Sequence, residues 1–225
     1  MHNHYPNKNR NPKRVIFSVL FSLLFINLSI AQDNHVVTIT NNSEFVQIQD
    51  YGEFMTAGNP YTVECLFKLN NLPNANISQA IFGSGEYFNP NFVRCSKPIV
   101  MVNRNNALGT YFEFILTERK NNNFGELVTL EIPYDLQTDT WYHVAFVYNG
   151  GNEFYFYVNG RRVGHATKRH FDLSCGRFSN NNMNIGGLNT SGANSFNLNG
   201  SVDEFRIWRK AKTEIEIQAE MYTHL

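Results

Sequence analysis

The sequence has no excess of charge of either sign. Its 225 residues include 19 Lys and Arg and 19 Asp and Glu, and charged residues make up only 17% of the chain. Capture of nucleic acid depends on a surplus of Lys and Arg that neutralises the phosphates. The balanced and sparse charge therefore argues against nucleic acid as a partner.

Cysteine is also scarce. Cys65, Cys95 and Cys175 are far apart in the sequence and form no CxxC pair, which argues against a zinc site. In an oxidising compartment three cysteines allow one disulfide and one free thiol, and the sequence does not name the pair. We expect Cys95 and Cys175 if a disulfide forms, because Cys65 lies on the apolar face of a predicted strand whereas the other two lie in irregular segments.

Long hydrophobic runs are absent except near the N-terminus. Residues 1–14 are polar and basic, and the apolar run VIFSVLFSLLFINLSIA follows, ending in Ser29-Ile30-Ala31. This order is typical of a secretory signal peptide. The competing interpretation is a membrane anchor, but roughly seventeen apolar residues are short for ~30 Å of hydrocarbon. We therefore expect a signal peptide at 1–31, a secreted extracellular domain at 32–225, and no stable membrane anchor once the leader is removed.

The chain is rich in β-favouring residues separated by turn signals. The stretch Trp141–Ala166 holds three such runs, and the turns between them are at Asn149-Gly150 and Asn159-Gly160. Asn-Gly supplies the positive φ angles that a tight hairpin turn requires. In the middle run Phe154 and Phe156 share one face, because side chains alternate along a strand. The stretch therefore predicts a three-stranded antiparallel meander with one buried face.

Similar patterns predict further strands along the whole chain. The fold class that we expect is all-β, a two-sheet antiparallel jelly-roll sandwich with a short C-terminal helix. The spacing of the apolar residues near Glu204 is irregular and predicts a bulge, and Thr213-x-x-Glu216 is a capping box that opens the helix. The predicted strands outside the meander are His35–Thr40 and Phe45–Gln49 (as a pair around the turn at 41–43), Tyr61–Leu69, Gln79–Gly83, Pro98–Asn103, Gly109–Glu118, Glu126–Ile132, Met183–Gly187 and Gly200–Arg209.

Four segments together resemble a known family in their order and spacing. They are YTVECLFKLN (61–70), TWYHVAFVYNGGNEFYFYVNGRRVG (140–164), MNIGG (183–187) and NGSVDEFRIWRKAKTEIEI (199–217). They resemble the LamG-like jelly-roll domains, related to laminin G and the pentraxins, within the concanavalin A-like lectin/glucanase superfamily. The resemblance covers roughly residues 35–222. It is strong for the fold and weak for function, because the family includes sugar binders, adhesion modules and appendages of enzymes.

Two pentraxin features do not carry over to this sequence. Pentraxins have a cysteine in the region of Cys65 that is bonded to one in the W-x-H-V strand, where this chain has Ala145. They also bind paired calcium ions through an acidic loop after the strand that matches 183–187. Here that loop, LNTSGANSFNLNG, has no carboxylate, whereas calcium prefers several among its ligands. A single laminin-type calcium site stays open, so calcium is a candidate cofactor and no cofactor is certain.

A glycoside hydrolase is the least favoured interpretation. Glucanases of the superfamily resemble one another in an E-x-D-x-E strand, and a retaining mechanism needs two carboxylates about 5 Å apart. No such triplet is present, and the adjacent Asp203 and Glu204 would face opposite sides of a strand. His143, Trp141 and Trp208 belong to the hallmark segments and are expected to be structural. We therefore expect no enzyme activity.

Candidate binding residues lie in the irregular segments. They combine apolar ring faces with amide and guanidinium donors, as saccharide sites do. The alternatives are that the aromatics fold inward onto the sheet and that the polar residues form plain turns. The predicted ligand-binding residues are Tyr87, Phe88, Asn89, Arg94, Arg104 and Asn189.

These observations favour a secreted non-catalytic recognition module that binds carbohydrate or a glycosylated cell-surface partner. The resemblance to lectins carries only modest weight for function. An extracellular protein–protein adhesion or scaffold domain without a sugar site is the alternative, and the sequence does not separate the two.

The first prediction is that the leader is cleaved near Ala31. The basic start, the short apolar run and the small residues at Ser29 and Ala31 motivate it. N-terminal sequencing of the exported protein should give a chain that begins near Gln32. A mature protein that still begins with Met1 would contradict the prediction.

Overall fold

The computed structural model describes residues 36–40, 44–49, 55, 58–75, 77–84, 98–120, 124–167, 183–188 and 196–223. The chain divides into two units, Met1–Asn34 and His35–Leu225, and all the described residues belong to the second. In this described part no helix has the length and apolar character that a membrane crossing requires.

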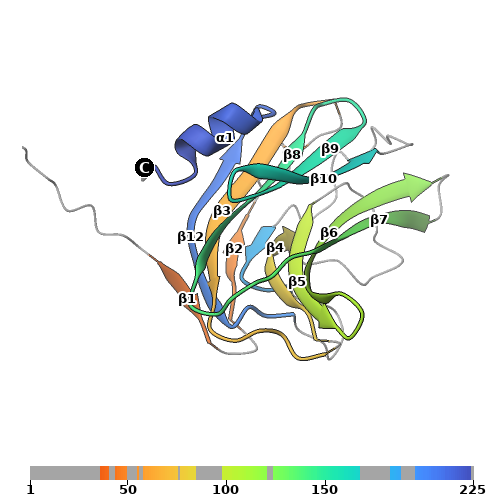
Figure 1. Ribbon diagram of the computed structural model, residues 1–225. Helices are drawn as coiled ribbons and strands as arrows, with labels where there is room; N and C mark the ends of the chain where they lie inside the picture. Colours follow the sequence, from red (N-terminus) through yellow and green to blue (C-terminus); the bar gives the residue numbers. More distant parts are fainter. Residues whose placement is uncertain are drawn as a thin grey trace, which may run out of the picture. The chain divides into compact units, whose positions relative to one another are not determined.

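The second unit is built from two six-stranded sheets in which every described pairing is antiparallel (Figure 1). The first sheet has the order β1 (Val37–Ile39), β12 (Gly200–Trp208), β3 (Tyr61–Leu69), β8 (Trp141–Tyr148), β9 (Glu153–Val158) and β10 (Arg161–Thr167). The second has the order β2 (Val46–Ile48), β11 (Met183–Ile185), β4 (Gln79–Ser84), β5 (Ile99–Asn105), β6 (Gly109–Lys120) and β7 (Phe124–Pro133). With the helix α1 (Glu214–Glu220), this confirms the predicted two-sheet jelly roll.

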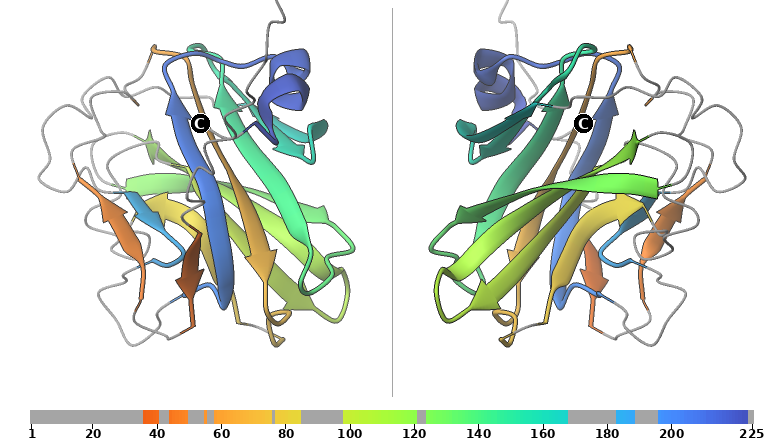
Figure 2. Two further views of the ribbon diagram at one scale, coloured as in Figure 1. Left: turned by 90° about the vertical axis from the view of Figure 1, so that its left-hand side faces the viewer. Right: turned by 90° about the vertical axis from the view of Figure 1, so that its right-hand side faces the viewer.

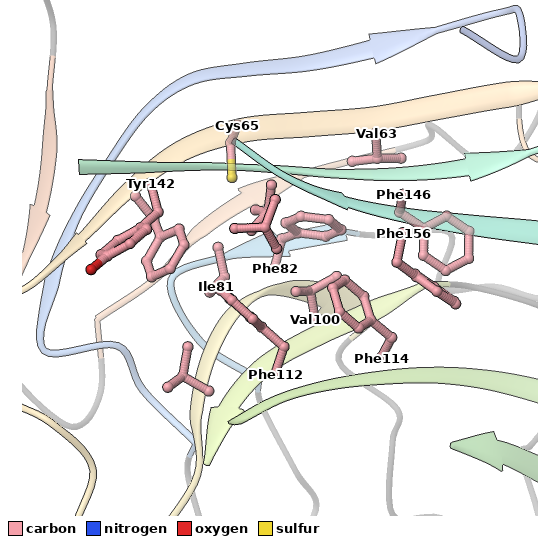
Figure 3. Close-up of a cluster of buried hydrophobic side chains, with 14 of the residues drawn as sticks. Val63, Cys65, Ile81, Phe82, Val100, Phe112, Phe114, Tyr142, Phe146 and Phe156 are labelled. Carbon is pink, nitrogen blue, oxygen red and sulfur yellow. The ribbon is translucent and has the colours of Figure 1, made fainter. Parts of the chain in front are cut away.

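The core lies between the two sheets and is dominated by aromatic side chains (Figure 3). Phe114 of β6 meets Phe156 of β9 with ring centroids 4.3 Å apart. Phe67 of β3 meets Phe112 of β6 edge-on at 5.9 Å. These contacts join one sheet to the other, so they fix which face of each strand points inward.

The predicted meander is confirmed as β8, β9 and β10. Phe154 and Phe156 are both 1% exposed and lie in the core, as the alternation predicts. Asn159 and Gly160 form the second turn with φ angles of 48° and 72°. The Asn159 side chain also accepts a hydrogen bond from the backbone N–H of His143 at 2.9 Å, which ties the turn to the neighbouring strand.

The first two strands do not pair with each other, and the prediction of a hairpin around 41–43 is wrong. β1 pairs with β12 in the first sheet, whereas β2 pairs with β11 in the second. An isolated short hairpin has little stability in water. Each three-residue strand instead gains backbone partners at the edge of a larger sheet, and Ile39 of β1 becomes 1% exposed.

The predicted bulge and capping box are both confirmed. The register of β12 against β3 shifts between Asp203 and Arg206, and Glu204 has a φ of 49°. Thr213 accepts a hydrogen bond from the backbone of Glu216, and the Glu216 side chain accepts one from the backbone of Thr213.

The helix α1 lies on the outer face of the first sheet, on the side away from the core (Figure 2). Its one buried residue, Ile217, packs against Ala145 and Val147 of β8 and against Tyr157 of β9. The capped helix therefore packs against two strands of the meander.

Cys65 is fully buried in β3 and is a free thiol. Burial raises the pKa of the thiol, and the nearby Glu64 carboxylate raises it further. An unreactive, neutral thiol in the core follows, as the strand pattern predicts. Cys95 and Cys175 lie outside the described residues, so their pairing stays a prediction.

The second prediction concerns the core. Phe156→Ala should lower the free energy of unfolding by about 3–5 kcal/mol, because it removes a ring that contacts Phe114 of the opposite sheet. Ile215→Ala is the matched control, since Ile215 of α1 is 78% exposed and its truncation should change stability by less than about 0.5 kcal/mol. Urea unfolding measures both. Equal effects of the two substitutions would contradict the assignment of Phe156 to the core.

Candidate ligand-binding face

A polar group of side chains occupies the outer face of the second sheet. Val102 of β5 and Phe112 and Phe114 of β6 point into the core. Because side chains alternate along a strand, Asn103 and the residues flanking Phe112 point the other way. The same alternation places Glu131 of β7 on this outer face, since it lies opposite Glu113 of β6 in the register. We call Asn103, Tyr111, Glu113 and Glu131 the β5–β7 polar patch.

A hydrogen bond on the buried side of the patch holds two of its residues together. The Asn103 side-chain amide donates to Oε2 of Glu113, and Asn103 is only 5% exposed. In the register Asn103 lies directly opposite Tyr111. Tyr111 and Glu113 are half-buried and Glu131 is exposed. The patch therefore presents two carboxyl groups and a phenol to solvent above a fixed amide.

The two carboxyl groups influence each other. Burial raises the pKa of Glu113, the hydrogen bond from Asn103 lowers it, and the charge of Glu131 raises it, with a net rise. Burial raises the pKa of the Tyr111 phenol, and the charges of Glu131 and Glu113 raise it further. Like charges directly opposite each other on neighbouring strands are unfavourable. A ligand that donates hydrogen bonds to these oxygens relieves that repulsion.

The middle of the same face is apolar and covered. Ala80, Ile99, Met101, Ile115 and Leu188 are buried there, and Phe196 packs against them. Met101 lies opposite Glu113 in the register, so the polar patch borders directly on this apolar cluster.

The arrangement fits a hydroxyl-rich ligand better than a metal ion. Carboxylates accept hydrogen bonds, and the side-chain amide and the phenol can also donate them. Calcium takes six to eight oxygen ligands, whereas within the described residues no group of three acidic, His or Cys side chains comes together. The patch therefore does not form a calcium cage of its own.

The structure places one of the six sequence-predicted site residues. Arg104 is exposed and belongs to β5, but it alternates with Asn103 and so lies on the opposite face from the patch. Its role in binding stays a prediction. Tyr87, Phe88, Asn89, Arg94 and Asn189 lie outside the described residues, and their assignment also stays a prediction.

The sequence alone did not reveal the acidic pair of the patch, Glu113 and Glu131. Glu113 carries a detectable signal, because it alternates with Phe112 and Phe114 in a predicted strand. Glu131 carries none on its own, since its position opposite Glu113 depends on the register between β6 and β7. A search for alternating acids on one strand cannot find a pair that is divided between two strands.

Comparison with known proteins supports the fold. A family model described as the concanavalin A-like lectin/glucanases superfamily matches residues 40–218. No curated protein matches the chain. The sialidase CBM40 of Ruminococcus gnavus, bound to α2,3-sialyllactose, is 16% identical with a TM-score of 0.59, and the match covers 84% of this chain and 96% of that one.

Two further structures show the same architecture. The pentraxin of Limulus polyphemus is 17% identical with a TM-score of 0.50, over 82% of this chain and 81% of that one. A botulinum neurotoxin DC binding domain, in complex with SialylT, is 11% identical with a TM-score of 0.53. The match covers 78% of this chain but spans only 38% of the toxin domain's chain. At such identities the likeness concerns the fold.

A second polar cluster is buried on the outer face of the first sheet, under α1. Glu64 of β3 is 1% exposed, and its Oε1 accepts hydrogen bonds from Lys212 Nζ at 2.6 Å and from the Trp208 indole at 2.7 Å. The Nε2 atom of His143 lies 3.5 Å from Glu64 Oε2. Lys212 also pairs with Glu220 of the helix at 2.8 Å. The burial of His143 confirms its predicted structural placement.

Arg206 extends this cluster to the C-terminal segment. Its guanidinium donates to Glu204 at 2.6 Å, to the Glu220 carbonyl at 2.9 Å and to the Thr223 carbonyl. Since Arg206 is 6% exposed, these contacts fasten the end of the chain to the sheet. The cluster has little access to solvent, so its role is structural.

The third prediction is the pH dependence of stability that Glu64 produces. Burial alone would raise the pKa of Glu64, but the contacts with His143, Lys212 and Trp208 lower it to about 2 from 4.5. Between these pH values the unfolded chain binds the proton and the folded protein does not. The contribution is therefore complete above about pH 4.5 and is lost as the pH falls towards 2.

Urea unfolding at a series of pH values measures this effect. The Glu64→Gln variant should be less stable than the parent at neutral pH, and the difference should shrink as the pH falls through this window. A difference that stays constant down to the lower end of the window would contradict the prediction.

Proposed function

The chain belongs to the concanavalin A-like lectin/glucanase superfamily, and we propose from this premise that it recognises carbohydrate, either free or on a glycosylated cell-surface partner. The proposal includes a non-catalytic role and an extracellular location. Sialylated ligands in two of the structural neighbours support the carbohydrate class. Fold likeness alone is weak evidence for function, so the proposal rests on the side chains of this chain.

The observation that carries the proposal is the hydrogen-bonded pair of Asn103 and Glu113 beside Tyr111, on an outer sheet face. A sugar hydroxyl both donates and accepts hydrogen bonds, and the patch offers acceptors and donors side by side. The ring of Tyr111 adds apolar surface of the kind that saccharide sites use. Because the amide of Asn103 is buried and bonded, the Glu113 carboxylate is oriented before a ligand arrives.

Export forms part of the same proposal. The leader at 1–31 predicts that the domain at 32–225 acts outside the cytoplasm, where glycans are displayed. The signals for this are the basic residues before the apolar run and the Ser29-Ile30-Ala31 ending.

The fourth prediction tests glycan binding. On a glycan array, probed with and without calcium, the protein should bind a subset of glycans. Tyr111→Ala and Glu113→Gln should weaken that binding by about tenfold or more, since each removes a hydrogen-bonding group or an apolar contact at the ligand. Tyr222→Ala and Glu214→Gln are matched controls, because both residues are exposed on or beside α1, away from the second sheet. Tyr87→Ala and Asn89→Ala test whether the sequence-predicted loop contributes.

Each result of the array separates the alternatives. A silent array would favour the adhesion or scaffold role, in which the domain contacts protein alone. Equal losses of glycan binding in the patch variants and in the controls would show that the patch is not the binding site. Release of reducing sugar from a polysaccharide would overturn the non-catalytic assignment.

A further inference from the structure

A hollow lies at the edge of the first sheet, on strands β9 and β10. Phe154 and Phe156 point into the core, so Glu153 and Tyr155 point to the outer face. The patch of the proposed function lies on the other sheet, so the two surfaces share no residue. The hollow is lined by Glu153, Tyr155, Arg162, Val163, Gly164 and His165.

A bulge creates this hollow. The register of β10 against β9 shifts between Arg162 and Gly164, so that Arg162 lies opposite Tyr157 and His165 lies opposite Tyr155. In a regular strand, residues three apart point to opposite faces. The extra residue Val163 removes this difference and places both Arg162 and His165 on the outer face. Bulges of this kind are common where a side chain is aimed at a site.

Gly164 allows β10 to hold this shape against the second sheet. A Cβ atom at Gly164 would lie 2.6 Å from Ile132 Cδ1 and 2.6 Å from Leu130 Cδ2, both of β7. Contacts that short do not occur between real side chains. The absence of a side chain at Gly164 is therefore part of how the bulge is accommodated.

The polar side chains of the hollow are held by one another. The Tyr155 hydroxyl donates to Glu153 Oε2 at 2.6 Å, and the Asn149 side chain donates to the same oxygen at 3.0 Å. The His165 ring stacks on Tyr155 at 5.2 Å with an angle of 22° between the planes, and His165 Nε2 lies 3.5 Å from Glu153 Oε1. Groups fixed in this way lose little freedom when a ligand binds.

Arg162 is the residue of the hollow whose hydrogen-bond donors are available to a ligand. Its guanidinium lies over the Tyr155 ring at 5.6 Å, and within the described part of the chain no carboxylate forms an ion pair with it. Arg162 is exposed, and a guanidinium presents a planar fork of N–H donors that matches a carboxylate. Glu153 lies in the same hollow and accepts hydrogen bonds from hydroxyl groups.

We propose that this hollow is a second ligand site, which takes an acidic sugar residue, with the sugar carboxylate on Arg162 and its hydroxyls on Glu153 and His165. The charge pattern selects this class. A neutral sugar leaves the fork of Arg162 without a partner, and a simple anion without hydroxyls meets the negative charge of Glu153. A carboxylate and hydroxyls on one ring satisfy both ends of the hollow. No bond is made or broken.

Calorimetric titration of the full chain with sialyllactose, lactose and sulfated lactose tests the site. Sialyllactose should bind more tightly than lactose, and Arg162→Ala should weaken its binding by about tenfold or more. Arg162→Lys should also weaken it, because the charge stays and the fork is lost. Arg161→Ala is the matched control, since Arg161 is also exposed but lies opposite the core residue Val158. It should change binding by less than about twofold.

The outcomes that would overturn the site are distinct. If the parent protein does not bind sialyllactose, there is no such site. Equal losses in the Arg161 and Arg162 variants would indicate diffuse electrostatic attraction, and equal binding of sulfated lactose that persists in Arg162→Lys would indicate a general anion site. Thermal unfolding confirms that each variant is folded. Arg162→Ala should leave the binding of uncharged glycans at the β5–β7 polar patch unchanged, so the failure of one surface is distinguishable from the failure of the other.

Discussion

The contact of Phe114 with Phe156, with ring centroids 4.3 Å apart across the two sheets, is the interaction on which the arrangement of both outer surfaces depends. When alternate side chains of a strand point into the core, the side chains between them must point to the outer face. Phe114 places Glu113 on the outside of β6, and Phe156 places Tyr155 on the outside of β9. A register slip of one residue would bury both polar groups, which is why packing in the core controls the chemistry of the surface.

The buried charged side chains on the first sheet hold the C-terminal helix in place. The helix α1 buries only Ile217, which gives it a small apolar contact with the sheet. Lys212 and Arg206 supply the remaining contacts between the helix and the sheet, because each of them connects the sheet to Glu220. Contacts with His143, Lys212 and Trp208 keep the Glu64 carboxylate ionised in spite of its burial. The end of the chain is thus fastened by directional contacts, which specify its position more narrowly than apolar packing would.

Local patterns were sufficient to predict the sandwich and its details near the C-terminus. The Asn-Gly turns, the alternation in β9, the bulge at Glu204 and the capping box at Thr213 all depend on residues that are close in sequence. The pairing of β1 and β2 and the acidic pair of Glu113 and Glu131 depend on partners far along the chain. No spacing rule carries that information, because the register between strands is set by turn length and by the fit of the core.

The hollow on β10 is a second case in which the sequence alone did not reveal a candidate site. Arg162 and His165 are three residues apart, and on a regular strand that spacing would separate them onto two faces. The shift at Val163 joins them on one face, and Gly164 leaves room for the side chains of Ile132 and Leu130 beside the shifted strand. The sequence R-V-G-H therefore determines the site through the way Gly164 packs against β7. It does not match a recognisable binding motif. Surfaces of this kind follow from how two sheets fit together, so they can differ among chains that share the fold.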